Sequence, residues 1–106
     1  MTKEQIFIYK EISKQITALD LLDIPWSKKG TCYIALSYEF FNMGHDLSGI
    51  ELLNKIPQSY FDENFKEELQ NEDFLEVVLL LIDFMMKSQF VEKSIDLKKI
   101  YLKFKN

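Results

Sequence analysis

The chain has 106 residues, of which 47% are hydrophobic, and a formal net charge of −4. This length and apolar content predict one domain over residues 1–106 with its own core, and they exclude a disordered chain. All thirteen basic residues are lysine, and the absence of arginine, the preferred reader of phosphate and guanine, argues against direct nucleic-acid binding.

The first helix is predicted over residues 3–22, where apolar residues recur at the spacing of one helical face: Ile8, Ile12, Ile16 and Leu19. A capping-box pair, Thr2 and Gln5, opens this helix. Ile24 ends it, because a residue that precedes proline avoids the helical region of backbone conformation.

Two further helices are predicted on either side of Gly44. The first covers residues 29–42, and Gly44 is the expected left-handed residue that ends it. The next helix begins with Asp46 or Ser48 as its N-cap. It ends near Ile56, because a proline follows.

The second half of the chain predicts three more helices. The fourth opens at Ser59 with Asp62 three residues later, and it turns three apolar side chains inward: Phe61, Phe65 and Leu69. Asn71 caps a fifth helix over residues 72–88. The sixth opens at Ser94 and carries an apolar stripe: Leu97, Ile100, Tyr101 and Phe104. Since no segment alternates with a period of two, we expect an all-α fold of five to six helices arranged as antiparallel hairpins.

The fifth predicted helix is apolar nearly all round between Phe74 and Met86. Such a helix usually lies at the centre of a bundle, so Leu80 is expected to be buried. A buried strand over residues 77–82 is the alternative, but no partner strand is visible. The stretch is too short to span a bilayer and contains two acidic residues, so we expect no membrane association.

Residues 30–56 resemble one tetratricopeptide repeat. The positions that carry the resemblance are Tyr33, Leu36, Ser37, Phe40 and Gly44 in the first helix, and Gly49, Leu53 and Ile56 in the second. Gly49 stands where the family usually has alanine, and a step of about 34 residues in either direction finds no second copy. The resemblance implies an antiparallel helix pair in the first half of the chain, as part of a stack that binds a ligand.

Modules similar to this repeat hold their ligands on the inner face of their first helices. In this chain that face offers Thr31, Ile34, Tyr38, Phe41 and Asn42. We take Ile34, Tyr38, Phe41 and Asn42 as the predicted partner-binding residues. Tyr38 and Phe41 are three positions apart and therefore adjacent on the helix, so we expect both side chains to be partly exposed.

The sequence offers no catalytic constellation. Its only histidine, His45, lies in a turn where we expect a solvated side chain, and its only cysteine, Cys32, lies about 20 Å away at the rise of a helix. No metal-binding or phosphate-loop motif is present, so we expect no enzyme activity, no cofactor and no metal site. The single cysteine excludes an internal disulfide, and the charged start of the chain is unlike a signal peptide, so a cytoplasmic location is expected.

These features favour a small non-catalytic binding module, an adaptor or chaperone for a protein or peptide partner; a homodimer is a further option. The alternative is an acidic inhibitor, bacterial or phage-borne, that occupies the basic groove of a nucleic-acid-binding protein. Residues 39–76 carry ten acidic side chains and two lysines. The patch for the alternative comprises Glu63, Glu67, Glu68 and Glu72, for which a solvated helix face is the default interpretation.

Overall fold

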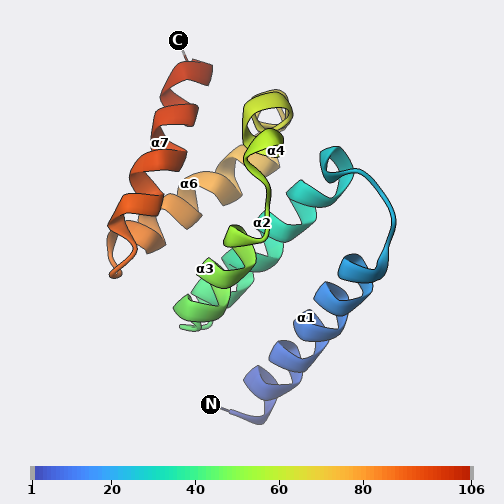
Figure 1. The fold of residues 1–106 in the computed structure, drawn as a ribbon. Helices are drawn as coiled ribbons and strands as arrows, with labels where there is room; N and C mark the ends of the chain where they lie inside the picture. The colour runs from blue at the N-terminus through green and yellow to red at the C-terminus, as the bar shows by residue number, and fades with distance from the viewer. Residues whose placement is uncertain (1, 106) are drawn as a thin grey trace.

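Helices account for most of residues 2–105, the part of the chain that the computed structural model describes (Figure 1). This part contains no strand, so the predicted all-α class is confirmed. It forms seven helices: α1 (Lys3–Leu21), α2 (Trp26–Asn42), α3 (Asp46–Asn54), α4 (Gln58–Glu63), α5 (Phe65–Glu68), α6 (Glu72–Met86) and α7 (Val91–Lys105). The number exceeds the predicted five to six because the predicted fourth helix is interrupted at Asn64 and forms the short α4 and α5.

Three of the predicted helix boundaries follow from local capping chemistry. Thr2 and Gln5 form the expected reciprocal capping box at the start of α1, with N···O distances of 2.9 and 3.1 Å. Gly44 follows α2 with a φ of 82°, the left-handed conformation that favours glycine. The Asn71 side chain accepts a hydrogen bond from the backbone N–H of Phe74 at 3.0 Å and so caps α6.

Other helix starts differ from the sequence-based expectation. α2 begins at Trp26 rather than at residue 29, because the carbonyl of Pro25 accepts the first backbone bonds of the helix. α3 begins at Asp46 with His45 as its N-cap, so neither Asp46 nor Ser48 is the cap. α7 begins at Val91, and Ser94 lies buried inside its first turn.

One hydrophobic cluster takes side chains from every helix: Ile12, Tyr33, Leu53, Tyr60, Phe65, Leu81 and Leu97 are members from α1 to α7 in order. The predicted inward residues of the fourth helix, Phe61, Phe65 and Leu69, are all buried. α2 is the central helix, since it contacts α1, α3, α4, α5 and α6, while α7 lies against α6 (Figure 1).

The predicted central place of the fifth helix is therefore wrong. α6 buries one face only, formed by Phe74, Val78, Leu81, Ile82 and Met85. Leu79 and Leu80 border that face on opposite sides, and each side chain remains 40% exposed. The local apolar pattern predicted the presence of this helix correctly, but it did not predict how many other helices cover it.

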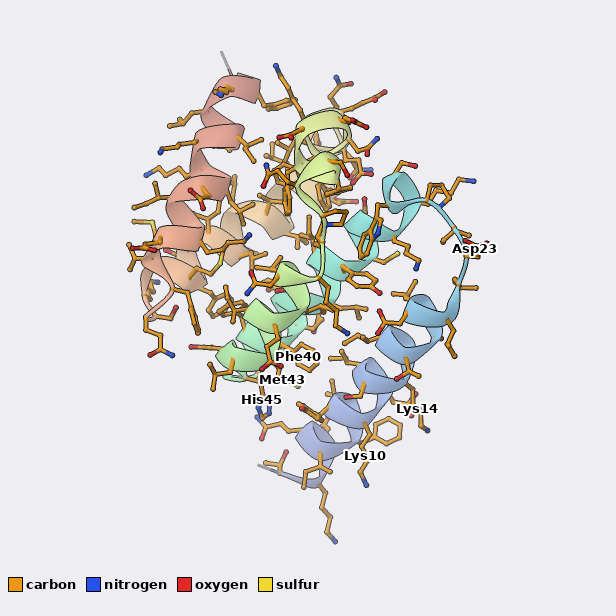
Figure 2. The ribbon with its side chains drawn as sticks, in the orientation of Figure 1. Lys10, Lys14, Asp23, Phe40, Met43 and His45 are labelled. Atoms are coloured by element: carbon orange, nitrogen blue, oxygen red, sulfur yellow. The ribbon has the colours of Figure 1, made fainter. Side chains whose placement is uncertain are left out.

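α1 is the most loosely packed of the long helices. Its one buried side chain is Ile12, and Ile8 from the predicted stripe is 37% exposed. The Tyr9 ring packs against Phe40 with centroids 5.4 Å apart. Figure 2 shows Phe40 beside α1, whereas Lys10 lies on the outer side of α1. Within residues 2–105, none of the helices combines the length and the apolar character that crossing a membrane requires.

Candidate binding site

The central helix α2 is covered on two of its sides. Toward α1, the Tyr33 phenol donates a hydrogen bond to Asp20, and the Phe40 ring packs against Tyr9 at a centroid distance of 5.4 Å. Toward α3, the Ser37 hydroxyl donates a hydrogen bond to the Gly49 carbonyl at 2.8 Å. A further part of the helix surface carries Thr31, Ala35, Tyr38 and Asn42, each of which is partly or fully exposed. Their spacing of four, three and four residues places them on one stripe.

Two of the four predicted partner-binding residues are not on this stripe. Ile34 is 1% exposed and Phe41 is 2% exposed, so the expectation that Phe41 is partly exposed is wrong. Phe41 packs against Phe90, with ring centroids 6.4 Å apart, because the segment before α7 covers this side of α2. Tyr38 is half-buried against Phe84, and Asn42 is exposed.

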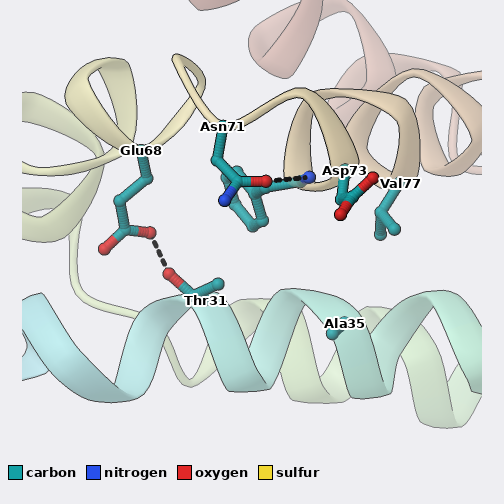
Figure 3. A pocket seen from close by; sticks show the side chains of 7 residues that line it. Thr31, Ala35, Glu68, Asn71, Asp73 and Val77 are labelled. Carbon is teal, nitrogen blue, oxygen red and sulfur yellow. Dashed lines mark hydrogen bonds between the residues drawn. The ribbon is translucent and has the colours of Figure 1, made fainter.

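A cleft of about 470 Å³ lies between α2 and the α5–α6 segment (Figure 3). It is lined by Thr31, Ala35, Glu68, Asn71, Asp73, Phe74 and Val77. Figure 3 shows Ala35 on α2 and Val77 on α6 facing the same space. Because Ala35 carries only a methyl group, its side chain leaves the space between the two helices unfilled.

Beyond the cleft, the same face of α6 carries further partly exposed apolar side chains. Asp73, Val77, Leu80 and Phe84 recur at four, three and four residues and therefore share one face of α6. Tyr38 lies at the far end of this row of side chains, since its ring lies 6.0 Å from that of Phe84. We call the whole feature, from Glu68 to the Tyr38–Phe84 pair, the α2–α6 cleft.

A carboxylate fixed by two hydroxyl groups forms the other end of the cleft. The Thr31 hydroxyl and the Tyr60 phenol both donate a hydrogen bond to Oε2 of Glu68 (Thr31–Glu68 in Figure 3). Tyr60 is fully buried, and this burial raises the pKa of its phenol well above the ordinary value, to which the hydrogen bond with Glu68 adds. The phenol therefore stays protonated and acts as a donor across the physiological pH range.

Gly30 allows Tyr60 to reach this position. A Cβ atom at Gly30 would overlap the Tyr60 ring, so only glycine permits the ring to lie on the backbone of α2. On its other sides the ring contacts Phe61 and Phe65, at centroid distances of 5.4 and 6.2 Å. Glu68 is thus held by a phenol that the core itself immobilises.

The cleft combines an apolar floor with negative charge. Its charged lining residues are Glu68 and Asp73, and no basic side chain lines it. Glu72 and Asp73 stand in the first turn of α6, where the positive end of the helix dipole stabilises carboxylates. The geometry suits a ligand with apolar groups and a cation.

The four residues of the predicted acidic patch divide into two kinds. Glu68 is half-buried and hydrogen bonded, as described above. Glu63, Glu67 and Glu72 are exposed. Glu63 and Glu67 line a separate hollow together with Lys66, Gln70 and Phe104.

Neither of the two residues considered for chemistry lines this cleft, although Cys32 lies next to Thr31 on α2. His45 was expected to be solvated, but it is half-buried and its ring packs edge-on against Tyr9 with centroids 4.9 Å apart. Cys32 is exposed on α2 with a free thiol. Among the described residues, no group of three or more His, Cys, Asp or Glu side chains could hold a metal ion.

The sequence contained a partial signal for the cleft. The small residues Gly30 and Ala35 on α2 and the apolar residues on two sides of α6 were visible, but their pairing across the chain was not. Comparison with protein-family models, with curated proteins and with solved structures yields no match to this chain.

Proposed function

We propose that this chain is a small non-catalytic protein-binding module, with an adaptor or chaperone role in the cytoplasm, that holds a segment of a protein or peptide in the α2–α6 cleft. The observation that carries the proposal is the uncovered apolar side of α6 next to α2. Val77 lines the cleft together with the small Ala35, and Leu80, on the same face of α6, remains 40% exposed.

Burial of this side by a partner is energetically favourable. Removing apolar surface from water contributes roughly 25 cal/mol per Å². Leu80 is 40% exposed, and the cleft of about 470 Å³ has room for the side chains of a bound segment. An aromatic pair, Tyr38 and Phe84, stands at one end, and aromatic side chains are frequent anchors in interfaces.

In this proposal α2 and α3 act as an antiparallel pair that resembles a tetratricopeptide repeat, with α2 as the ligand-bearing first helix. The left-handed Gly44 between the helices and the small Gly49 against α2 support this interpretation. The bound face is then the stripe of Thr31, Ala35, Tyr38 and Asn42, of which Thr31, Tyr38 and Asn42 belong to the face expected from the sequence.

Two neighbouring leucines allow a matched test. Leu79 and Leu80 are of the same type and have the same 40% exposure, but helical spacing places only Leu80 on the face of α6 that carries Val77. Tagged wild-type protein, Leu80→Asp and Leu79→Asp are expressed in the native host, and the proteins captured with each are quantified by mass spectrometry. We expect Leu80→Asp to lose the partner and Leu79→Asp to retain it.

Equal capture by the two variants, with both shown to be folded by circular dichroism, would contradict the proposal.

The expectation that the protein is not catalytic has its own test. Cys32→Ser and His45→Ala should retain the partner and the biological activity. An activity lost in either variant at unchanged stability would point to catalysis.

A further inference from the structure

We infer that the segment held in the α2–α6 cleft is cationic and amphipathic, with apolar side chains over Ala35 and Val77 and a Lys or Arg side chain against Glu68 and Asp73. This inference rests on the proposed function and specifies the chemistry of its partner. It excludes acidic and purely apolar segments as the preferred occupants.

Charge complementarity is the first argument. Both charged residues that line the cleft are acidic, and two further carboxylates, Glu72 and Glu76, are exposed on the first two turns of α6. An acidic segment would meet like charge at this end, whereas a basic one would be attracted. The wall on the α2 side offers Thr31 and Ala35 near this end, and neither is basic.

The fixed geometry of Glu68 is the second argument. Most surface carboxylates lose side-chain freedom when they pair with a cation, and this loss offsets much of the gain. Glu68 is already held by the hydroxyl groups of Thr31 and Tyr60. The Glu68 side chain is therefore already ordered when a guanidinium or ammonium group binds to it, so binding does not carry the entropy loss of ordering this carboxylate.

The spacing along the cleft sets the pattern of the segment. Thr31 marks the acidic end and Tyr38 the aromatic end, and seven residues of helix separate them by about 10 Å. A bound helix spans this distance between residues about seven apart, and an extended chain between residues about three apart. The basic residue and the apolar anchor should therefore be separated by one of these two intervals.

A display library of random peptides of about twelve residues, a length that spans the cleft in either conformation, tests the inference. Peptides are selected on the immobilised full chain, and the enriched ones are synthesised. Their affinities are measured for wild type, Glu68→Gln, Glu67→Gln and Leu80→Asp. Glutamine at position 68 keeps an acceptor for both hydroxyl groups and removes only the charge, and thermal melting checks that the fold is retained.

We expect Lys or Arg to be enriched at one of the two intervals from an apolar residue. Glu68→Gln should weaken these peptides by about tenfold or more, since a charge-assisted bond is lost. Glu67→Gln, an exposed neighbour outside the cleft, should change the affinity by less than about twofold.

The other outcomes overturn the inference in distinguishable ways. Enrichment of neutral or acidic peptides that Leu80→Asp weakens and Glu68→Gln does not would leave the proposed function standing and refute the cationic occupant. Enriched peptides indifferent to both variants would refute the cationic occupant and count against the cleft as the binding face. Failure to enrich any peptide, or a dimer of the wild type that Leu80→Asp dissociates, would refute a separate cationic segment.

Discussion

The two contacts that α2 makes with α3 and with α6 differ in how they use small residues. On the α3 side, a Cβ added to Gly49 would lie 2.6 Å from the ring of Phe41, so the small residue is matched by a large one and the contact is closed. On the α6 side, Ala35 faces Val77, and the space between them stays open as a cleft of about 470 Å³. A small residue thus produces tight packing only where the partner helix supplies a side chain that fills the gap.

The largest expected effect separates two adjacent positions of α6. Leu81 is fully buried, and Leu81→Asp should abolish folding, because an unpaired buried charge costs several kcal/mol. Leu80→Asp should cost only about 1 kcal/mol, typical of a half-exposed site. Urea denaturation followed by circular dichroism measures both. A Leu80→Asp variant that fails to fold would mean that the α2–α6 cleft is closed in solution.

Phe41 and Tyr38, the aromatic pair expected at the binding face, should also differ in how much their truncation lowers the stability. Phe41→Ala removes a buried ring that packs against Phe90, and a loss of about 3–5 kcal/mol in unfolding free energy is expected. Tyr38→Ala should cost less than half of that, because Tyr38 is only half-buried. If Tyr38 anchors the partner, its truncation should also weaken binding by about 2 kcal/mol.

Calorimetric titration of the identified partner measures the second effect. If the Tyr38→Ala variant is folded and binds with wild-type affinity, Tyr38 is not part of the binding site. The acidic-inhibitor alternative predicts a different pattern: replacing Glu63, Glu67 and Glu72 together by Gln should then abolish binding. The cleft proposal tolerates this triple replacement.

Three helix caps determined by neighbours in sequence were predictable, although the starts of α2 and α7 and the N-cap of α3 were not, and contacts between distant residues were not predictable at all. The caps at Thr2, Gly44 and Asn71 depend on contacts within three or four residues, and all three are where the sequence placed them. The Thr31–Glu68 bond joins residues 37 apart, and nothing in either local pattern marks it.

The exposure of apolar residues shows the same limit. Phe41 was expected at the surface and Leu80 in the core, and the structure reverses both. Each sits on a helix with apolar residues on more than one side, so periodicity alone leaves open which side is covered. The segment around Phe90, which covers Phe41, comes from elsewhere in the chain, and α6 packs against α2 through a face that leaves Leu80 exposed.

A glycine and an alanine on α2 sharpen the comparison between closed and open contacts. At a solvent-exposed position of a helix, replacing glycine by alanine raises the stability by about 1 kcal/mol, because alanine has the higher helix propensity. In Gly30→Ala the added Cβ overlaps the Tyr60 ring, so a net loss of about 2 kcal/mol is expected. Ala35→Val, beside the open cleft, should stay within about 0.5 kcal/mol of wild type. A stabilised Gly30→Ala would show that Tyr60 is free to move, and with it Glu68.

The smallest expected effect concerns the third contact of α2, with the end of α1. Asp20 accepts a hydrogen bond from the Tyr33 phenol, and the Lys55 ammonium lies 3.0 Å from its other oxygen. The hydrogen bond from Tyr33, followed by the interaction with Lys55, lowers the pKa of Asp20 below its ordinary value of 3.8. A lowered folded-state pKa contributes stability that is fully present above the unfolded value and is lost as the pH falls through the folded one.

Asp20→Asn should therefore lower the unfolding free energy at pH 6, and the difference from wild type should shrink as the pH falls below about 4. The loss at pH 6 should stay below about 1 kcal/mol, because the carboxylate is largely solvated and exposed ion pairs contribute little. Asp23→Asn, in the exposed connection after α1 (Figure 2), is the matched control and should show no such pH dependence. Urea titrations at pH 6 and pH 3 compare the three proteins. A difference that persists undiminished at pH 3 would mean that the Asp20 carboxylate does not hold α1 through its charge, and that α1 is retained by apolar packing, to which Ile12, Tyr9, Ile16 and Leu19 contribute.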